Sequence, residues 1–418
     1  MRAVIMAGGK GTRLYELTKN EIPKPMVQLY GKPLLQWQIE ALKKEGILDI
    51  IIVVGYMKDK IQSYFKDGKA FDVNITYIEE YEPLGTAGAL SMLKDLQDNF
   101  LLIYGDLIFD INVSKMMQFH TTHSALITAF VHPNSHPFDS DIVVLEKERI
   151  KLIDSKHNNR TYWYSNCTNA GIYIVNPSIC KYIACQKTDF ENDVLMKWIS
   201  TELVFGYKSA EYVKDVGTIE RIRQVEEDIK NALPLKRNSK NKQKAFFLDR
   251  DGTINQEVGL ISDPSQLVLA PRAADAIKLI NQSEYLAIIV TNQPVIAKGM
   301  CDLNTLNTIH DKLETLLGYE GAYVDAIYYC PHHPDRGFEN ERPEYKISCN
   351  CRKPNIGMLQ AAARDFNIDF TNSWTIGDRE IDIQTGINAG TKTARVGPEG
   401  QFIDLANAVS VILEKKYE

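Results

Sequence analysis

Two groups of residues in this sequence have the types and spacing that phosphate chemistry needs. In the first half, Gly8 and Gly9 open the run Gly-Gly-Lys-Gly-Thr-Arg, which ends at Arg13. Glycines let backbone N–H groups approach a phosphate, and a guanidinium can hold two phosphate oxygens at once. In the second half, Asp249 and Asp251 follow the apolar run Phe-Phe-Leu with one residue between them. Alternate side chains of an extended segment point the same way, so both carboxylates can face one pocket.

The glycine run alone is a weak signal, because a tight strand-to-helix turn explains it nearly as well. It lacks the Gly-Lys-Ser/Thr ending of a Walker A loop and the third glycine of the dinucleotide fingerprint. Lys24 adds to the signal, since it stands between two prolines that fix an extended backbone. Asp106 and Asp215 each follow an apolar stretch, and two carboxylates around Mg²⁺ would clamp a triphosphate at its α-phosphate. Asp215 could equally be a turn residue or a helix cap.

The second half holds a more complete set. Asp249 can act as nucleophile and Mg²⁺ ligand, while Asp251 can protonate the leaving group and then activate water. Four further polar residues follow or neighbour apolar runs and could meet a phosphate or a metal: Thr291, Asn292, Lys353 and Asp378. In this order, they offer a hydroxyl, an amide, a positive charge and a second carboxylate for a metal. Asp382, one helical turn after Asp378, could assist that carboxylate. A strand-end turn would explain one of these acids but not the whole ordered set.

A cluster of thiols and imidazoles lies in the same half. Cys330, His332, Cys349 and Cys351 have the short spacings within each pair that suit a tetrahedral structural Zn²⁺ site. The alternative is a set of unmetallated cysteines in a long polar loop. The stretch 334–348 shows neither helical nor strand periodicity, so a metal is the better candidate for ordering it. The total of seven cysteines is odd, which argues against a disulfide framework.

Strand-like apolar runs alternate with longer helical patterns in both halves, which predicts parallel sheets with sites at the carboxyl ends of the strands. A length of 418 residues predicts two or three domains at roughly 150 residues each. The basic, polar stretch 234–244 is typical of a solvated linker. We therefore expect an α/β protein of two domains, residues 1–233 and 245–418, each a mostly parallel sheet flanked by helices.

Composition excludes several classes of protein. Hydrophobic residues make up 44% and charged residues 24%, as in a globular protein, and the net charge of −6 offers no basic field for nucleic acid. No apolar run approaches the roughly 20 residues of a membrane span. The first residues pass directly into a strand and the glycine run, so we expect no signal peptide and a cytoplasmic location.

Six motifs of the first half, in the same order, occur in a known family: MAGGKGTRL, IPKPM, LGTAGAL, YGD, NAGIYIV and KDVGT. This half resembles the sugar-1-phosphate nucleotidylyltransferases, which implies a Rossmann-like fold. The resemblance implies a triphosphate cradle of Gly8, Gly9, Gly11, Thr12 and Arg13, and a base site at Gly85, Thr86 and Gly88. It implies sugar-phosphate contacts from Lys24, Lys156, Asn169, Gly171 and Glu191, and a Mg²⁺ held by Asp106 and Asp215.

The second half resembles the haloacid-dehalogenase-type phosphatases, through DRDGTIN, TNQ, CRKP and GDREID. With the CPHH and CNC segments, it is most similar to the D-glycero-D-manno-heptose 1,7-bisphosphate phosphatases, and close to the histidinol-phosphate phosphatases. The resemblance implies catalysis by Asp249, Asp251, Thr291, Asn292 and Lys353, and Mg²⁺ at Asp249, Asp251 and Asp378. It further implies phosphate contacts from Arg352 and Lys353, and Zn²⁺ at Cys330, His332, Cys349 and Cys351, with His333 as second choice. Too few residues separate Asp249 from Thr291 for a large cap domain.

Together the two resemblances predict a bifunctional enzyme that makes GDP-D-glycero-α-D-manno-heptose from GTP and heptose phosphates. The base is implied only by likeness to guanylyltransferases. One alternative is a mannose- or other hexose-1-phosphate transferase fused to a different phosphatase. Another is a sugar-nucleotide sensor, although such a protein would be expected to have lost Asp106 or Asp249. The sequence leaves open whether the chain forms an oligomer.

Overall fold

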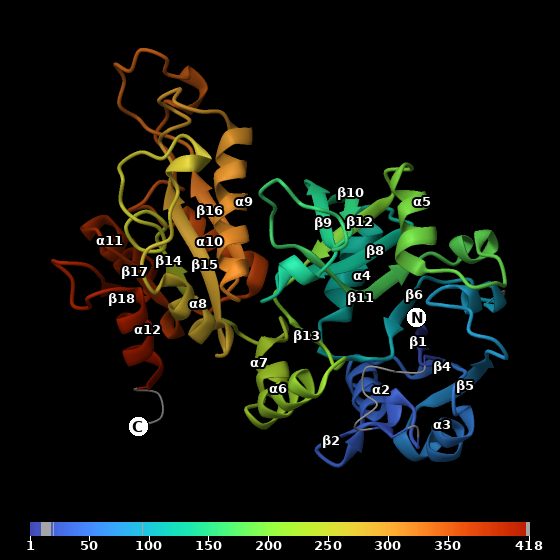
Figure 1. Ribbon diagram of the computed structural model, residues 1–418. Coiled ribbons are helices and arrows are strands. Elements are labelled where there is room, and N and C mark those ends of the chain that lie inside the picture. The colour runs from blue at the N-terminus through green and yellow to red at the C-terminus, as the bar shows by residue number, and fades with distance from the viewer. Residues whose placement is uncertain (10–17, 20, 94, 415–418) are drawn as a thin grey trace. The chain divides into compact units, whose positions relative to one another are not determined.

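The structure is a computed structural model that describes residues 1–9, 18–19, 21–93 and 95–414 (Figure 1). The chain forms two compact units, which are described separately. The first comprises Met1–Val131, Val143–Ile153 and Asn169–Asn238, and the second comprises His132–Ile142, Asp154–Thr168 and Ser239–Glu418.

The first unit is built on a nine-stranded sheet in the order β5-β4-β1-β6-β11-β8-β12-β10-β9. Strands β5, β4, β1 and β6 run parallel to their neighbours, whereas β11 runs antiparallel to β6. Most of these strands are apolar runs buried on both faces, as covered parallel strands are. Their bounds are β1 Ala3–Met6, β4 Asp49–Val54, β5 Asn74–Glu79, β6 Phe100–Tyr104, β8 Ile127–His132, β9 Ile142–Glu146, β10 Arg149–Asp154, β11 Thr168–Val175 and β12 Val204–Lys208.

Two short antiparallel ribbons and several helices complete this unit. One ribbon pairs β7 (Leu107–Asp110) with β13 (Tyr212–Asp215), and the other pairs β2 (Gln28–Leu29) with β3 (Lys32–Pro33). Helix α2 buries Leu35, Ile39 and Leu42, which are spaced to form one apolar face against the sheet. The helices are α2 Leu34–Lys44, α3 Lys58–Phe65, α4 Val113–Thr122, α5 Met196–Ile199, α6 Ile219–Lys230 and α7 Leu233–Arg237; short 3₁₀ turns are η2 Lys24–Met26, η3 Lys69–Phe71, η4 Gly88–Met92 and η6 Pro177–Tyr182, and η7 Phe190–Leu195 is a π-helical turn.

The basic stretch 234–244 is more ordered than the expected solvated tether. Helix α7 occupies its first residues, with Pro234 in the first helical turn, where the missing N–H costs no hydrogen bond. Arg237 and Asn238 are buried, and the division between the two units falls after Asn238. The assignment of residues 1–233 and 245–418 to separate folding domains remains our proposal.

The second unit contains a five-stranded, fully parallel sheet in the order β16-β15-β14-β17-β18. Helices α8 and α12 pack on each other, while α11 packs on β17 and β18. The strands are β14 Lys244–Leu248, β15 Tyr285–Asn292, β16 Ala326–Cys330, β17 Trp374–Gly377 and β18 Lys392–Arg395. The helices are α8 Ala273–Asn281, α9 Leu303–Tyr319, α10 Gly357–Phe366, α11 Glu380–Ala389 and α12 Leu405–Glu414, with 3₁₀ turns η5 Pro137–Asp139, η8 Pro264–Gln266, η9 Pro343–Tyr345 and η10 Phe370–Asn372.

The predicted fold class, two α/β domains with helices on their sheets, is confirmed. The parallel arrangement extends over the whole sheet of the second unit, whereas the sheet of the first is mixed because β11 enters it antiparallel to β6. Among the described residues, every helix is too short or too polar to cross a bilayer.

Candidate active sites

Gly8 and Gly9, at the start of the glycine run, lie beside Asp106 because β1 and β6 are neighbouring parallel strands in register. Met6 at the end of β1 pairs with Tyr104 at the end of β6. The backbone N–H of Gly105 then donates to the Met6 carbonyl oxygen at 3.0 Å. A Cβ at Gly105 would lie 2.6 Å from that oxygen, so this close approach requires glycine. This register explains why both segments lie at the carboxyl ends of neighbouring strands, as predicted.

These segments border a cleft of about 410 Å³. Its walls combine backbone-rich glycine segments with a lysine and two acids, a composition that can accept a phosphorylated ligand. The lining residues are Met6, Ala7, Gly8, Gly9, Lys24, Pro25, Glu80, Pro83, Gly85, Thr86, Tyr104, Gly105, Asp106 and Gly217. Of the predicted triphosphate cradle, Gly8 and Gly9 therefore line the cleft, whereas Gly11, Thr12 and Arg13 lie outside the described residues.

Lys24 and Asp106 form an ion pair in this cleft, with Lys24 Nζ 2.7 Å from Asp106 Oδ2. Asp215 is brought to the same region because β13 pairs with β7, and the N–H of Val216 donates to the Asp106 carbonyl at 2.9 Å. The Asp215 carboxylate accepts hydrogen bonds from Arg221 at 2.6 Å. Burial alone would raise the pKa of Asp215, but the Arg221 guanidinium outweighs it and lowers that pKa. Asp215 is thus kept ionised near Asp106, as a metal carboxylate must be.

The segment predicted to border the base is held by a second loop. Thr86 Oγ1 donates to Asp189 Oδ2 at 3.0 Å and accepts from the N–H of Phe190 at 2.7 Å. Gly85 has a φ of +77° and pairs with Thr188, so a side chain there would strike that residue's backbone. Gly88 packs against the Gln186 carbonyl rather than lining the cleft.

Three of the predicted sugar contacts form one hydrogen-bonded group. The Tyr173 hydroxyl donates to Glu191 Oε1 at 2.8 Å and accepts from the Asn169 amide. The N–H of Gly171 donates to Asn169 Oδ1 at 3.3 Å. Tyr104, whose hydroxyl is 3.5 Å from Glu191 Oε1, lines the cleft and connects this group to it.

Lys156 is placed differently from the other predicted sugar contacts. Its ammonium pairs with Asp139 at 3.2 Å, and both residues belong to the second unit. Lys156 is not among the described residues that line the cleft of the first unit.

In the second unit, Asp249 directly follows the central strand β14. Its carboxylate contacts the buried ammonium group of Lys353. Lys353 Nζ lies 2.6 Å from Asp249 Oδ1 and 2.5 Å from Asp382 Oδ1, and also donates to the Val290 carbonyl at 3.0 Å. Burial raises the pKa of Asp249, while the adjacent Lys353 ammonium opposes that rise. Two buried carboxylates, those of Asp249 and Asp382, therefore contact the same ammonium group.

Asp251 is fixed by three donors. Arg250 donates to it at 2.8 Å, and the Asn255 and Gln293 amides donate at 3.1 and 2.8 Å. Arg250 itself is fully buried. These contacts fix the position of the carboxylate, and its role in proton transfer stays a prediction.

Thr291 and Asn292 end β15 beside β14, as predicted. Thr291 is buried and its Oγ1 accepts from Gln293 at 3.0 Å. The Asn292 side chain holds the backbone of Lys353, accepting from its N–H at 3.0 Å and donating to its carbonyl at 3.3 Å. In this arrangement Asn292 positions the lysine, although we had expected its amide to meet a phosphate.

Three carboxylates form a candidate cation site. Oxygen atoms of Asp249, Asp378 and Asp382 lie within 4.8 Å of one another. Asp378 Oδ1 is buried without a hydrogen-bond partner in the described ranges, and burial raises the pKa of this carboxylate. A hard divalent cation such as Mg²⁺ fits this donor set, since it accepts carboxylate oxygens and supplies the missing partner. Asp251, which we also predicted as a ligand, is outside this group.

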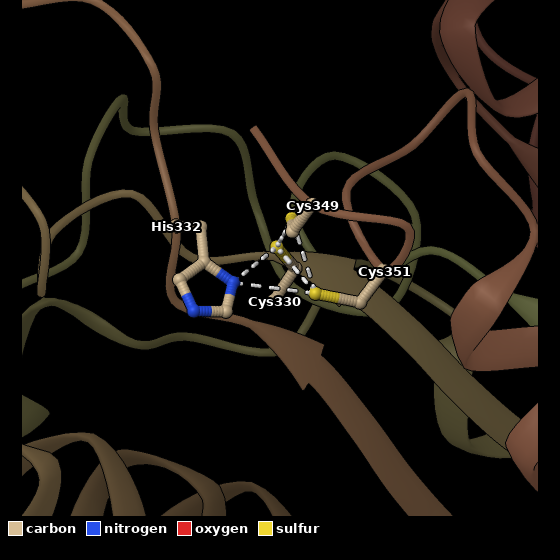
Figure 2. Close-up of side chains that lie close together, drawn as sticks. All are labelled: Cys330, His332, Cys349 and Cys351. Atoms are coloured by element: carbon tan, nitrogen blue, oxygen red, sulfur yellow. Dashed lines mark hydrogen bonds between the residues drawn. The ribbon is translucent and has the colours of Figure 1, made fainter. Parts of the chain in front are cut away.

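Figure 2 shows the second candidate metal centre, where Cys330, His332, Cys349 and Cys351 point toward one another. Cys351 Sγ lies 3.1 Å from Cys330 Sγ, 3.3 Å from Cys349 Sγ and 3.3 Å from His332 Nδ1. Burial raises the pKa of Cys330, so thiolates could be held this close only by a cation. Three sulfurs and one imidazole nitrogen at such separations suit tetrahedral Zn²⁺.

Two neighbours complete the description of this loop. Arg352 donates to the His332 backbone carbonyl at 3.1 Å, and its predicted contact with a substrate phosphate stays a prediction. His333 lies outside the four-residue group, and its Nδ1 accepts from the N–H of Asp335 at 3.2 Å.

Sequence reasoning missed two polar residues of the first unit. Asp189 anchors Thr86, and Glu80 lines the cleft with a buried carboxylate whose pKa is raised by burial. Glu80 directly follows β5, whose sequence is Asn-Ile-Thr-Tyr-Ile-Glu, but it stands among other acids, so the sequence offered no signal that singled it out.

The chain has likenesses to known proteins in both units. Residues 2–232 match the family model described as nucleotidyl transferase, and residues 350–400 match the model described as HAD-hydrolase-like. Over 223 residues the chain is 32% identical to the "Probable mannose-1-phosphate guanylyltransferase 1" of Oryza sativa, covering 52% of this chain and 61% of that protein. It is 33% identical over 222 residues to the mannose-1-phosphate guanyltransferase of Schizosaccharomyces pombe, with the same coverage. The chain thus spans about 61% of the length of these curated relatives.

Two solved structures are also similar. HddC from Yersinia pseudotuberculosis is 27% identical, with 55% of this chain and 99% of that chain covered and a TM-score of 0.47. The D,D-heptose 1,7-bisphosphate phosphatase of B. bronchiseptica, complexed with magnesium and phosphate, is 33% identical, with 41% and 99% covered and a TM-score of 0.36. The family match over more than half of the sequence is the decisive one: the chain belongs to the nucleotidyl transferase family and carries in addition a HAD-hydrolase-like domain.

Proposed function

We propose that the chain is a bifunctional enzyme of GDP-heptose synthesis that acts on one sugar in two steps. The second unit removes the 7-phosphate of D-glycero-D-manno-heptose 1,7-bisphosphate. The first unit then transfers GMP from GTP to the heptose 1-phosphate and releases pyrophosphate. One observation carries this proposal: each unit sets a lysine–aspartate pair, Lys24–Asp106 and Lys353–Asp249, at the carboxyl ends of parallel strands.

In the phosphatase step, an Asp249 oxygen attacks the 7-phosphorus and the phosphorus–oxygen bond to the sugar breaks. Asp251 gives its proton to the departing sugar oxygen, then takes one from the water that hydrolyses the aspartyl-phosphate. Lys353, 2.6 Å from Asp249, balances the charge that gathers at the phosphoryl group. Mg²⁺ held by Asp249, Asp378 and Asp382 would neutralise further phosphate charge.

The transfer step needs no general base, because a sugar 1-phosphate is already largely ionised near neutral pH. Its oxygen attacks the α-phosphorus of GTP and pyrophosphate leaves. The residues lining the cleft align the two substrates, with Lys24 next to the sugar phosphate, and Asp106 and Asp215 holding Mg²⁺ when it is bound.

The proposed substrate places a requirement on the phosphatase step. Transfer requires the 1-phosphate, so a phosphatase that removed it would destroy the acceptor. The proposal therefore requires selectivity for position 7, and the open loops around the second site are the elements that would supply it.

A test uses heptose 1,7-bisphosphate, GTP and Mg²⁺, with phosphate and pyrophosphate followed separately. Asp249→Asn removes the nucleophile and should lower phosphate release at least about 1,000-fold, yet leave pyrophosphate release from heptose 1-phosphate intact. Asp106→Asn should do the reverse. Asp275→Asn and Asp98→Asn, which change exposed carboxylates of the same two units, serve as controls. Loss of both activities in both site variants would contradict two independent centres.

A second candidate function is favoured by the curated relatives. Both relatives described above are named for mannose 1-phosphate, so a hexose 1-phosphate could be the acceptor. The second unit would then dephosphorylate another sugar phosphate, or a histidinol-phosphate-type substrate. A higher kcat/KM for mannose 1-phosphate than for heptose 1-phosphate would support this candidate over the first. If neither phosphate nor pyrophosphate appears with any of these substrates, a sensor becomes the better explanation.

A further inference from the structure

Each of the two acids that would hold Mg²⁺ in the first unit is paired with a positively charged side chain. Lys24 Nζ lies 2.7 Å from Asp106 Oδ2, and Arg221 Nη1 lies 2.6 Å from both oxygens of the Asp215 carboxylate. An ammonium and a guanidinium group therefore balance the charges of the two carboxylates. Unlike Lys24, Arg221 belongs to none of the six sequence motifs of the first half.

The start of helix α6 positions Arg221. The helix begins directly after Thr218, whose Oγ1 accepts a hydrogen bond from the Arg221 N–H at 3.3 Å and caps the first turn. This turn places the guanidinium against Asp215. The N–H of Gly217 also donates to Asp215 Oδ1 at 3.1 Å. Among the described residues, Oδ2 accepts a hydrogen bond from Arg221 alone, so this oxygen keeps a lone pair that a metal ion can use.

Both positive charges act on Asp215. Burial raises the pKa of Asp215, but the charges of Arg221 and Lys24 outweigh burial and lower that pKa. The N–H of Val216 donates to the Asp106 carbonyl at 2.9 Å, which ties the segment of Asp215 to that of Asp106. The neighbouring Gly217 lines the cleft together with Lys24 and Asp106. Asp215 is therefore held beside the cleft under the influence of two cations.

This arrangement of charges favours a metal–nucleotide complex over a free metal ion. A free divalent cation that approaches the carboxylates is repelled by the guanidinium and the ammonium, which offsets part of its attraction to the carboxylates. A nucleoside triphosphate that carries one divalent cation is negatively charged as a whole, so the same two side chains attract it. The side chains of Arg221 and Asp215 are 32% and 33% exposed, so the guanidinium can exchange a carboxylate oxygen for a phosphate oxygen at the surface.

We propose that Arg221 is a positioning residue that acts through Asp215 and makes metal uptake in the first unit depend on the nucleotide. The divalent cation then enters together with the nucleoside triphosphate and binds poorly by itself. This inference rests on the proposed transferase function, and it assigns to one arginine the coupling between cation and nucleotide. It is the charge of Arg221, rather than its shape, that produces the coupling.

The first experiment measures binding of Mn²⁺ to the full chain without nucleotide, by electron paramagnetic resonance. Every chain carries Asp249→Asn, which removes a ligand of the candidate cation site of the second unit. Arg221→Gln should bind Mn²⁺ about 10-fold more tightly than the chain with Arg221, because a positive charge beside Asp215 is lost. Arg221→Lys keeps the charge and should bind Mn²⁺ as weakly as the chain with Arg221. Arg223→Gln, which changes an exposed arginine of the same helix, should have no effect.

Two results of this experiment would overturn the inference. One is an Arg221→Gln chain that binds Mn²⁺ no more tightly than the chain with Arg221; weaker binding would show that Arg221 only holds Asp215 in place. The other needs no change at position 221. It is tight Mn²⁺ binding by the chain with Arg221, without nucleotide, that Asp106→Asn abolishes.

The second experiment measures pyrophosphate release with GTP, Mg²⁺ and a sugar 1-phosphate. In Arg221→Gln the KM for the magnesium–nucleotide complex should rise about 10-fold, with a smaller change in kcat, and Arg221→Lys should restore most of it. If pyrophosphate is released but Arg221→Gln leaves Mn²⁺ binding unchanged, the inference fails and the transferase assignment stands. If Mn²⁺ binding changes as expected but no nucleotide yields pyrophosphate, it is the transferase assignment that fails.

Discussion

At the scale of single residues, glycines decide how closely functional groups approach each other. Gly252 has a φ of +79°, and a Cβ there would lie 2.7 Å from Asp378 Cγ. Gly259, in the same unit, has a φ of +83° with nothing within 4 Å of its Cβ position. Substitutions at these two glycines therefore separate the cost of backbone strain from the effect of displacing Asp378, a carboxylate of the candidate cation site.

We expect Gly252→Ala to lower phosphatase kcat/KM about 100-fold, because the methyl group displaces the Asp378 carboxylate. Gly259→Ala should introduce the same backbone strain as Gly252→Ala, roughly 1–2 kcal/mol, because both glycines have a positive φ. The Gly259→Ala variant should nevertheless retain most of the phosphatase activity. Phosphate release and thermal unfolding of both variants check this. Equal loss of activity in the two would show that strain, rather than displacement of Asp378, is responsible.

The side chains of the second site were predictable because each follows an apolar run in the sequence. Asp249, Thr291 and Asp378 end three neighbouring strands, and parallel strands bring such ends together. Glu80 was not predictable in this way. It stands among other acids in a polar stretch, which suggests a solvated surface, and the glycines that bury it lie elsewhere in the sequence.

At the scale of elements, the contact between α4 and β8 contains a buried histidine. His120 is 1% exposed, and its Nδ1 lies 2.8 Å from Thr128 Oγ1. Burial lowers the pKa of His120 from 6.5 to about 4. Between pH 4 and pH 6.5, His120 is therefore protonated in the unfolded chain and neutral in the folded chain.

The contact between α4 and β8 should lose up to about 3 kcal/mol of stability as the pH falls from 6.5 toward 4. The stability is fully present above pH 6.5, since the histidine is then neutral in both states. Amide hydrogen exchange in α4 and β8, corrected for intrinsic rates, should show this loss in the unaltered chain and in a His157→Asn control, which changes an exposed histidine. The loss should be absent in His120→Asn. An identical pH dependence in His120→Asn would contradict the assignment to His120.

The elements themselves were largely predictable, and their pairing was less so. The runs that became β1, β4 and β14 are apolar and short, which predicts buried parallel strands. The antiparallel entry of β11 beside β6 depends on contacts distant in the sequence, which no local pattern encodes. Helix α7 was missed because five basic residues in a polar stretch indicate solvent exposure, although Arg237 is buried.

At the scale of the whole molecule, the two units should respond separately to metal removal. Cys349→Ser removes one ligand of the proposed zinc site, and we expect it to abolish stoichiometric zinc in the purified chain. It should lower the free energy of unfolding of the second unit by about 4 kcal/mol where free zinc exceeds its Kd roughly 1,000-fold. Phosphatase activity should fall with it, and nucleotidyl transfer should persist.

Metal analysis and thermal unfolding check this expectation. Cys185→Ser, which changes an exposed thiol outside the cluster, should keep zinc and both activities. A Cys349→Ser protein with full zinc content would contradict the four-ligand assignment.

The composition of the two units also shows where sequence reasoning ends. The two-domain class was predicted from alternating patterns, but the grouping of residues 132–142 and 154–168 with the second unit was not. These segments lie in the first half of the sequence, and their grouping depends on packing partners such as Thr315, whose Oγ1 donates to the Tyr164 carbonyl at 2.9 Å.

The short distance in sequence between the thiol cluster and the buried ammonium has a consequence for how the second unit should respond to oxidants. One residue separates Cys351 from Lys353, so oxidation of the cluster would release the stretch that holds the lysine against Asp249. If the proposed two-step function holds, peroxide should stop phosphate release from the bisphosphate, while a sugar 1-phosphate already present should still react with the nucleotide. Loss of the first reaction would then limit the second through its substrate, without any damage to the first unit.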